Sequence, residues 1–189
     1  MIKHVLFIIL ATTSLASADA KTDAKVDTKK MASTPADELT SLSKFMVGTW
    51  HCEGTTTPLP AVGKAFSSKG NVTWALTLDG FWLGGTSEGE KVPGQPLPTV
   101  FKGEGRVTYD RVAKQFVNLA VGNRGTFTSS TSKGFEGDKL VWSGTTSGLV
   151  KSETRGTLTK KGDKEYHFVA ERMENGKWVV GSDETCKKK

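Results

Sequence analysis

The distribution of glycine is the feature that most restricts what this chain can fold into. All 21 glycines of the 189 residues lie between Gly48 and Gly181. There they make up about one residue in six, against a usual ~7%. Between them, runs rich in β-branched and aromatic residues alternate with turn signals roughly every ten residues, which indicates an all-β domain. The predicted strands are 47–54, 66–78, 81–89, 100–109, 115–122, 125–133, 138–146, 149–160, 164–174 and 177–186.

The turns between these strands connect neighbours in the sequence. Asn-Gly and Asp-Gly pairs are strong hairpin signals, and Gly-Asp pairs come next. They occur at Asn175-Gly176, Asp79-Gly80, Gly137-Asp138 and Gly162-Asp163. Consecutive hairpins form a meander, and closing it removes both edge strands. The predicted fold is therefore an antiparallel up-and-down β-barrel of about ten strands.

Two proline-containing loops and one helix complete the predicted barrel domain, residues 36–186. Loops 55–64 and 92–98 either rim the mouth of the barrel or are ordinary connections. The helix is expected at about 36–44, with Thr34 as its cap and Pro35 at its first position.

The N-terminal segment has the organisation of an export signal. Residues 1–20 begin with basic residues, continue as a short apolar run, and end in two A-x-A cleavage patterns. The run is too short to anchor the chain in a bilayer, so we expect an exported protein, either periplasmic or extracellular. Residues 21–35 contain no aromatic residue and predict a disordered leader.

The charge of the chain is concentrated outside the predicted barrel. The net charge is +6, and residues 21–36 together with the basic tail 187–189 account for five of these charges. The remaining residues 37–186 carry about +1, so a nucleic-acid-binding face, which needs clustered lysine and arginine, is disfavoured. No later segment has the ~18 apolar residues of a membrane span.

The predicted export indicates how the two cysteines, Cys52 and Cys186, are used. Thiols in an oxidising compartment tend to pair, and a Cys52–Cys186 bond would close a loop of about 134 residues. The chain-entropy estimate for such a loop is about 4–5 kcal/mol. The alternative is two free cysteines on distant strands. Only His51 lies near either cysteine in sequence, so no zinc site is expected.

Several sequence blocks resemble known barrels. Gly48-Thr49-Trp50, after a short helix, resembles the opening of the calycin group of lipocalin and fatty-acid-binding barrels. Residues 39–186 are similar to an exported bacterial family of lipocalin-like barrels, a domain of unknown function. The matching blocks are Leu78-Asp79-Gly80-Phe81-Trp82-Leu83, Phe101-Lys102-Gly103-Glu104-Gly105, Val107-Thr108-Tyr109-Asp110 and Glu174-Asn175-Gly176-Lys177. The resemblance implies a barrel, with Gly48 and Trp50 at its floor, and transfers no catalytic residue.

A related group, the nitrobindin-type ten-stranded barrels, binds haem through a histidine close to the C-terminus. The last histidine of this chain is His167, and the final predicted strand has none. The resemblance therefore does not extend to the haem ligand, and we expect no cofactor.

Strand alternation indicates which side chains face the interior. If Asp79-Gly80 is a two-residue turn, Leu78 and Phe81 share a face with Val72, Trp74, Leu76 and Leu83, while Trp82 points the other way. Val107 with Tyr109, and Leu140 with Trp142, are the corresponding pairs on later strands. Aromatic residues at these positions either fill a barrel core or contact a ligand.

The last hairpin leaves two faces open. With Asn175-Gly176 as its turn, one face carries Tyr166, Phe168, Ala170 and Val179. The other carries His167, Val169, Glu171, Met173, Trp178, Val180 and Cys186. A disulfide to Cys52 would favour the second face as the inner one. The candidate ligand-binding residues are accordingly Trp74, Phe81, Tyr109, Trp142, His167, Glu171 and Trp178.

Recognised catalytic motifs are missing from the sequence. There is no Gly-x-Ser-x-Gly, His-Glu-x-x-His, phosphate-binding loop or Cys-x-x-Cys, so neither an enzyme nor a metal site is expected. The favoured function is a monomeric barrel that binds a small apolar or amphipathic molecule in its lumen. The alternative is a barrel filled by its own side chains that acts through its surface loops, and the volume of the lumen distinguishes the two.

Overall fold

A computed structural model describes residues 34–59, 63–96, 99–148 and 150–189 of the chain. The predicted signal peptide and residues 21–33 of the predicted leader lie outside these ranges. The described part contains one helix and eleven strands. They are α2 (Asp37–Met46), β1 (Gly48–Thr56), β2 (Phe66–Thr77), β3 (Trp82–Gly89), β4 (Lys102–Asp110), β5 (Gln115–Gly122), β6 (Thr126–Ser132), β7 (Phe135–Glu136), β8 (Lys139–Ser147), β9 (Ser152–Gly162), β10 (Glu165–Glu174) and β11 (Lys177–Lys188).

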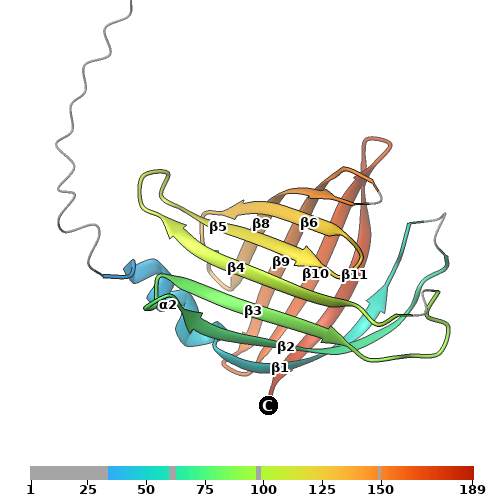
Figure 1. Ribbon diagram of the computed structural model, residues 1–189, viewed down its shortest axis with the longest axis horizontal. Coiled ribbons are helices and arrows are strands. Elements are labelled where there is room, and N and C mark those ends of the chain that lie inside the picture. The colour runs from blue at the N-terminus through green and yellow to red at the C-terminus, as the bar shows by residue number, and fades with distance from the viewer. Residues whose placement is uncertain (1–33, 60–62, 97–98, 149) are drawn as a thin grey trace, which may run out of the picture. The chain divides into compact units, whose positions relative to one another are not determined.

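The strands form an antiparallel sheet that closes on itself (Figure 1). The long strands pair with their neighbours in the sequence, β6 pairs with β8, and β1 pairs with β11 to complete the circle. This arrangement confirms the predicted up-and-down barrel of ten long strands preceded by one short helix. The two-residue strand β7 was not predicted, because a pair of residues in the β6–β8 connection is too short to produce a periodic signal.

Helix α2 packs at one end of the barrel, where it contacts β2, β3 and β4 (Figure 1). Its buried apolar side chains, Leu39, Leu42 and Met46, recur at helical spacing. The predicted capping was wrong, because the helix begins at Asp37 and its N-cap residue, Ala36, has no side-chain cap. Thr34 and Pro35 precede the helix, and the Thr34 carbonyl instead accepts a hydrogen bond from Arg111.

Trp50 lies between the helix and the barrel wall. Its side chain is fully buried, and its Nε1 donates a 2.7 Å hydrogen bond to the Met46 carbonyl at the end of α2. The Lys188 Nζ lies 5.1 Å from the centre of the Trp50 ring and donates to the Phe45 carbonyl. Gly48 has a φ of +125°, a backbone conformation that favours glycine, and the end of the Lys188 side chain lies beside it. The predicted basic tail is therefore largely part of β11.

The β2–β3 turn is longer than predicted. Thr77 pairs with Trp82, and the four residues 78–81 form the connection, with both Leu78 and Asp79 at positive φ. The pairing of Leu76 with Leu83 agrees with the predicted register, but β1 begins opposite Trp74. Leu76 and Leu78 thus extend beyond the end of β1 and are 47% and 69% exposed. Their predicted place in the barrel interior was wrong.

Both proline-containing loops connect strands at the end of the barrel opposite α2 (Figure 1). They approach each other closely, because a Cβ at Gly63 would lie 2.8 Å from the Pro96 side chain. This contact places them together at the rim. No helix in the described part of the chain is long and apolar enough to cross a membrane.

Candidate functional site

A cavity of about 460 Å³ occupies the barrel interior and reaches the inner side of α2. Strand alternation directs every second side chain into it, so that β2, β5, β6, β8, β9 and β10 all contribute. Most of its lining is apolar. The apolar lining residues are Leu42, Met46, Val72, Trp74, Leu83, Leu140, Trp142, Leu158, Tyr166, Phe168 and Ala170.

Trp74 forms part of the cavity wall and owes its position to Gly85, with Gly105 in ordinary contact beside it. A Cβ at Gly85 would lie 2.4 Å from the Trp74 ring, and one at Gly105 would lie 3.7 Å from it. The indole therefore lies flat across β3 and β4, where side chains are absent. Its Nε1 is buried and has no hydrogen-bond partner in the described part of the chain. A buried donor of this kind is costly unless a ligand or water accepts its hydrogen bond.

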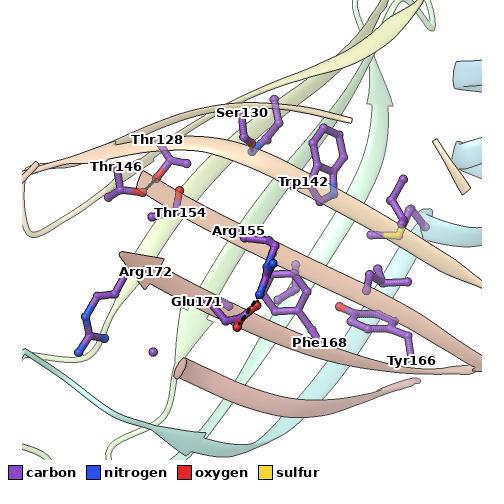
Figure 2. Close-up of a pocket in the computed structure, with 18 of the residues that line it drawn as sticks. Thr128, Ser130, Trp142, Thr146, Thr154, Arg155, Tyr166, Phe168, Glu171 and Arg172 are labelled. Carbon is purple, nitrogen blue, oxygen red and sulfur yellow. Dashed lines mark hydrogen bonds and ion pairs between the residues drawn. The ribbon is translucent and has the colours of Figure 1, made fainter. Parts of the chain in front are cut away.

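The polar groups of the wall are mostly bonded to one another. The Asn118 Nδ2 donates to the Ser130 hydroxyl at 3.1 Å, and the Thr128 and Thr146 hydroxyl oxygens lie 2.8 Å apart. Figure 2 shows the two threonines facing each other across neighbouring strands. These pairs give the cavity wall a few polar groups that can orient a ligand. Most of the area of the wall is apolar.

Arg172 connects the cavity wall to the rim. Its guanidinium donates to the Thr57 and Pro58 carbonyls, at 2.8 and 3.2 Å, and so holds the loop after β1 against β10. The guanidinium also pairs with the Glu174 carboxylate. Sequence reasoning missed Arg172, because nothing in its local pattern indicates contact with a loop 114 residues away.

Of four predicted ligand-binding aromatic residues, two line the cavity and two lie outside its lining. Trp74 and Trp142 line the cavity. Tyr109 instead packs edge-on against Phe116, with ring centres 5.1 Å apart, and burial followed by the nearby Glu38 carboxylate raises its pKa. Phe81 lies in the β2–β3 turn, outside the cavity lining, because this turn is longer than two residues.

A β-bulge decides the orientation of the last hairpin. The β10–β11 pairing slips by one residue between Ala170 and Glu171, which leaves Gly181 unpaired. Beyond the slip Cys186 pairs with Tyr166, so the disulfide shares a face with Tyr166 and not with His167. The predicted inner face was therefore wrong. His167 points outward and forms a 2.6 Å contact with the Asp183 carboxylate.

Glu171 and Trp178 lie on this same outer face. The Glu171 carboxylate accepts two hydrogen bonds from the Arg155 guanidinium, at 2.7 and 2.9 Å, which lower its pKa. The guanidinium lies over the Trp178 ring at 4.7 Å. Arg155 and Glu171 are both among the residues that line the cavity (Figure 2), although alternation places them on the opposite face of the sheet from Gly156 and Ala170.

A smaller compartment of about 240 Å³ lies beside the main cavity, and Val72 lines both. Its lining includes a partly buried carboxylic acid, Glu184, which accepts a 2.9 Å hydrogen bond from the Ser68 hydroxyl. Burial raises the pKa of Glu184, and the Asp183 carboxylate adds to this effect. Sequence reasoning missed Glu184, although it lies two residues before Cys186 and alternation alone places the two on one face.

The disulfide predicted from the sequence is confirmed. Cys52 and Cys186 are directly opposite each other on β1 and β11, and both are buried. Their sulfur atoms and a Glu184 oxygen lie within 4.8 Å of one another. Because both thiols are used in the disulfide, this cluster has only one free ligand group and does not fit a metal ion.

The raised pKa of Glu184 predicts how the stability of the protein depends on pH. The folded protein holds this proton more tightly than the unfolded chain, so stability falls as pH rises from about 4.5 through the raised pKa. Glu184→Gln removes this effect and is expected to be more stable than the wild type at pH 7, with the difference vanishing by about pH 4. Urea unfolding between pH 4 and pH 7 measures it.

A control variant, Glu171→Gln, is expected to change stability in the opposite direction. The pKa of Glu171 is lowered by Arg155, so its pairing stabilises the protein above the usual carboxyl range and is lost as pH falls. Glu171→Gln is therefore expected to be less stable than the wild type at pH 7. Equal pH profiles for Glu184→Gln and the wild type would show that Glu184 titrates as an exposed carboxylate.

Comparison with known proteins identifies the fold. No family model matches the sequence, and no curated protein matches it. The barrel is shared with a solved structure. That structure, the crystal structure of Rv2717c from M. tuberculosis, superposes with a TM-score of 0.63 at 16% sequence identity. The match covers 82% of this chain and 99% of Rv2717c, so the likeness extends over the whole barrel and establishes the architecture alone.

Proposed function

We propose that this protein binds a small apolar or amphipathic molecule inside the barrel. The observation that supports this most directly is the 460 Å³ cavity with its largely apolar, aromatic wall. Ligand sites in proteins commonly measure about 300–1,000 Å³ and combine such walls with a few polar groups. Transfer of apolar surface from water into the cavity supplies the driving force.

The unpartnered Trp74 Nε1 supplies an orienting contact. A ligand atom that accepts its hydrogen bond would satisfy a donor that the protein leaves buried without a partner. The neighbouring hydroxyl and amide groups are paired with each other, an arrangement that suits orienting a bound molecule, and we propose binding as the function. The cavity also favours this function over the alternative of a barrel filled by its own side chains.

We also propose that the protein is exported and monomeric. The Cys52–Cys186 disulfide suits an oxidising compartment, and the signal-like residues 1–20 suit export. A native mass spectrum of the protein purified from its own host tests the function directly. A retained small molecule in one polypeptide chain is the expected result, whereas a bare chain that also fails to bind apolar probes would contradict the proposal.

Filling the cavity is expected to weaken binding. Ala170 lines the cavity on β10, and Ala170→Phe would place a ring in the space that the ligand occupies. We expect at least a tenfold loss of affinity for an apolar fluorescent probe, since the ring displaces apolar contacts equivalent to several methylene groups. Val169→Phe adds the same ring on the outer face and is the matched control. Equal affinities in both variants would place the binding site outside the barrel.

A further inference from the structure

The compartment around Glu184 is a separate chemical environment within the barrel. Glu184 projects inward between Gly54 of β1 and Phe168 of β10, its partners across the two neighbouring strands. Ser68 and the Cys52–Cys186 disulfide lie against its carboxyl group. Val72 lines both this compartment and the main cavity, so the two spaces are neighbours in the barrel.

The Glu184 carboxyl has no cationic partner in the described part of the chain. Its one hydrogen bond comes from the neutral Ser68 hydroxyl, and it takes part in no ion pair. An isolated buried carboxylate is unfavourable, whereas a carboxylate paired with a cation and hydrogen-bonded is much less so. A positively charged ligand group would supply the missing partner.

The other charged groups that border this compartment already have partners. Lys69 lies 2.8 Å from the Glu53 carboxylate, and Glu88 lies 2.6 Å from the Lys102 ammonium group. Arg124, from the β5–β6 turn, donates to the Thr99 carbonyl, although its Nε is buried without a partner. Glu90 also lines the compartment and lies 4.0 Å from the His51 ring. Among the described residues that line it, Glu184 is therefore the acid without an ion pair, and Arg124 is a competing anchor for a ligand of opposite charge.

Two aromatic rings complete the compartment. Phe66 and Phe101 both line it, together with Val72 and Val92. The Arg124 guanidinium already lies over the Phe101 ring, 5.9 Å from its centre. A carboxylate accompanied by aromatic and aliphatic side chains suits an organic ammonium group, because the carboxylate neutralises the cation and an aromatic face attracts it.

We propose that Glu184 binds the ammonium group of an amphipathic amine whose apolar part occupies the main cavity. This assignment rests on the proposed function and narrows it to a class of ligand. The carboxylate accepts hydrogen bonds from the ammonium group, and the apolar chain passes Val72 to reach the wall formed by Trp74 and Trp142. No bond is made or broken.

Three ligands with the same ten-carbon chain test the assignment. Decylamine, decanol and decanoate compete with an apolar fluorescent probe for the wild type and for Glu184→Gln at pH 7. We expect the wild type to prefer decylamine over decanol by at least about tenfold, the usual gain for a hydrogen bond to a charged group. Glu184→Gln loses this preference and binds decanol as before. Glu165→Gln, on the outer face of β10, is the matched control and retains it.

The outcomes separate this inference from the proposed function. If all three ligands bind equally, the barrel is an apolar carrier and the role of Glu184 is refuted. A preference for decanoate would assign the head group to Arg124 and also refute it. If neither the probe nor any of the three ligands binds, the proposed function itself fails. Because amine and alcohol are compared within each variant, a general loss of stability cannot imitate the expected result.

Acidification supplies a second measurement. Protonation of Glu184 removes the charge that attracts the amine, and its raised pKa moves this loss to a higher pH than for an exposed carboxyl. The charged residues that line the compartment with it are Lys69, Glu88, Glu90 and Arg124. The Tyr166 phenol on β10, whose pKa burial also raises, and the adjacent Asp183 carboxylate on the outer face also interact with it. We expect the amine preference of the wild type to decrease toward pH 4, and that of Glu184→Gln to be absent throughout.

Discussion

Removal of the Cys52–Cys186 disulfide is expected to lower the free energy of unfolding by about 4–5 kcal/mol. The bond spans a sequence separation of 134 residues and joins β1 to β11, the first and last strands of the barrel. Without it, the unfolded chain gains the entropy of an open loop, and the strands that close the barrel are joined only by hydrogen bonds and packing. The variant Cys52→Ala/Cys186→Ala, compared with the wild type by equilibrium urea unfolding, measures this loss.

The melting temperature offers an independent readout of the same change. For a domain of this size, a loss of about 4–5 kcal/mol corresponds to a decrease of roughly 10–20 °C. A reducing agent should destabilise the wild type to a similar extent and leave the double variant unaffected, which controls for effects of the agent itself. A decrease below about 1 kcal/mol would contradict the loop-entropy account.

Replacement of Trp50 by alanine is the second large effect, a loss of about 3–5 kcal/mol. The ring packs between Phe45 and Tyr166, with centres 5.3 and 4.8 Å away, so its removal leaves a void at the junction of helix and barrel. The hydrogen bond to Met46 is also lost. Thermal and urea unfolding of Trp50→Ala measure the total, and we expect α2 to become less protected in hydrogen exchange.

Two other substitutions separate the contributions of Trp50. Trp50→Phe keeps much of the apolar volume but removes the donor, and is expected to cost less than the alanine variant. Trp178→Ala removes an indole from the outer face, where it is 39% exposed, and should cost below about 1 kcal/mol. Similar losses for Trp50→Ala and Trp178→Ala would show that the packing beneath the helix does not hold the fold together.

Most of the fold followed from local signals. The hairpin at Asn175-Gly176 and the strands on either side of it were predicted because both carry short-range information, a tight-turn pair and runs of strand-forming residues. The predicted start of α2 was less accurate. Thr34 can cap a helix only when its side chain lies near the first turn, but the N-cap residue is Ala36, and the Thr34 carbonyl bonds to Arg111. Element boundaries depend on such contacts, which the sequence does not display.

The candidate site was predicted where alternation continued without interruption. Trp74 and Trp142 line the cavity, as their parity indicated, because the register of β2 and β8 has no irregularity. His167 was misplaced because a bulge at Gly181 shifts its partner strand by one residue. Phe81 was misplaced because the turn before it is longer than two residues. The bulge reversed the orientation of the side chains beyond it, whereas the longer turn kept the register of β2 and β3 and only removed Phe81 from the strand.

The sequence by itself determined that this chain is an antiparallel barrel, because strand length, turn chemistry and glycine content are local properties. It also favoured a Cys52–Cys186 disulfide over two free cysteines, from the predicted compartment, and the structure confirms the bond. The tertiary structure decided which acid faces the interior. Glu184 lies inside and Glu171 outside because a single unpaired glycine changes the register of the last hairpin. Tight-turn and alternation signals do not indicate that slip, and β11 also has to pair with β1, a strand far away in the sequence, where Cys52 and Cys186 are 134 residues apart.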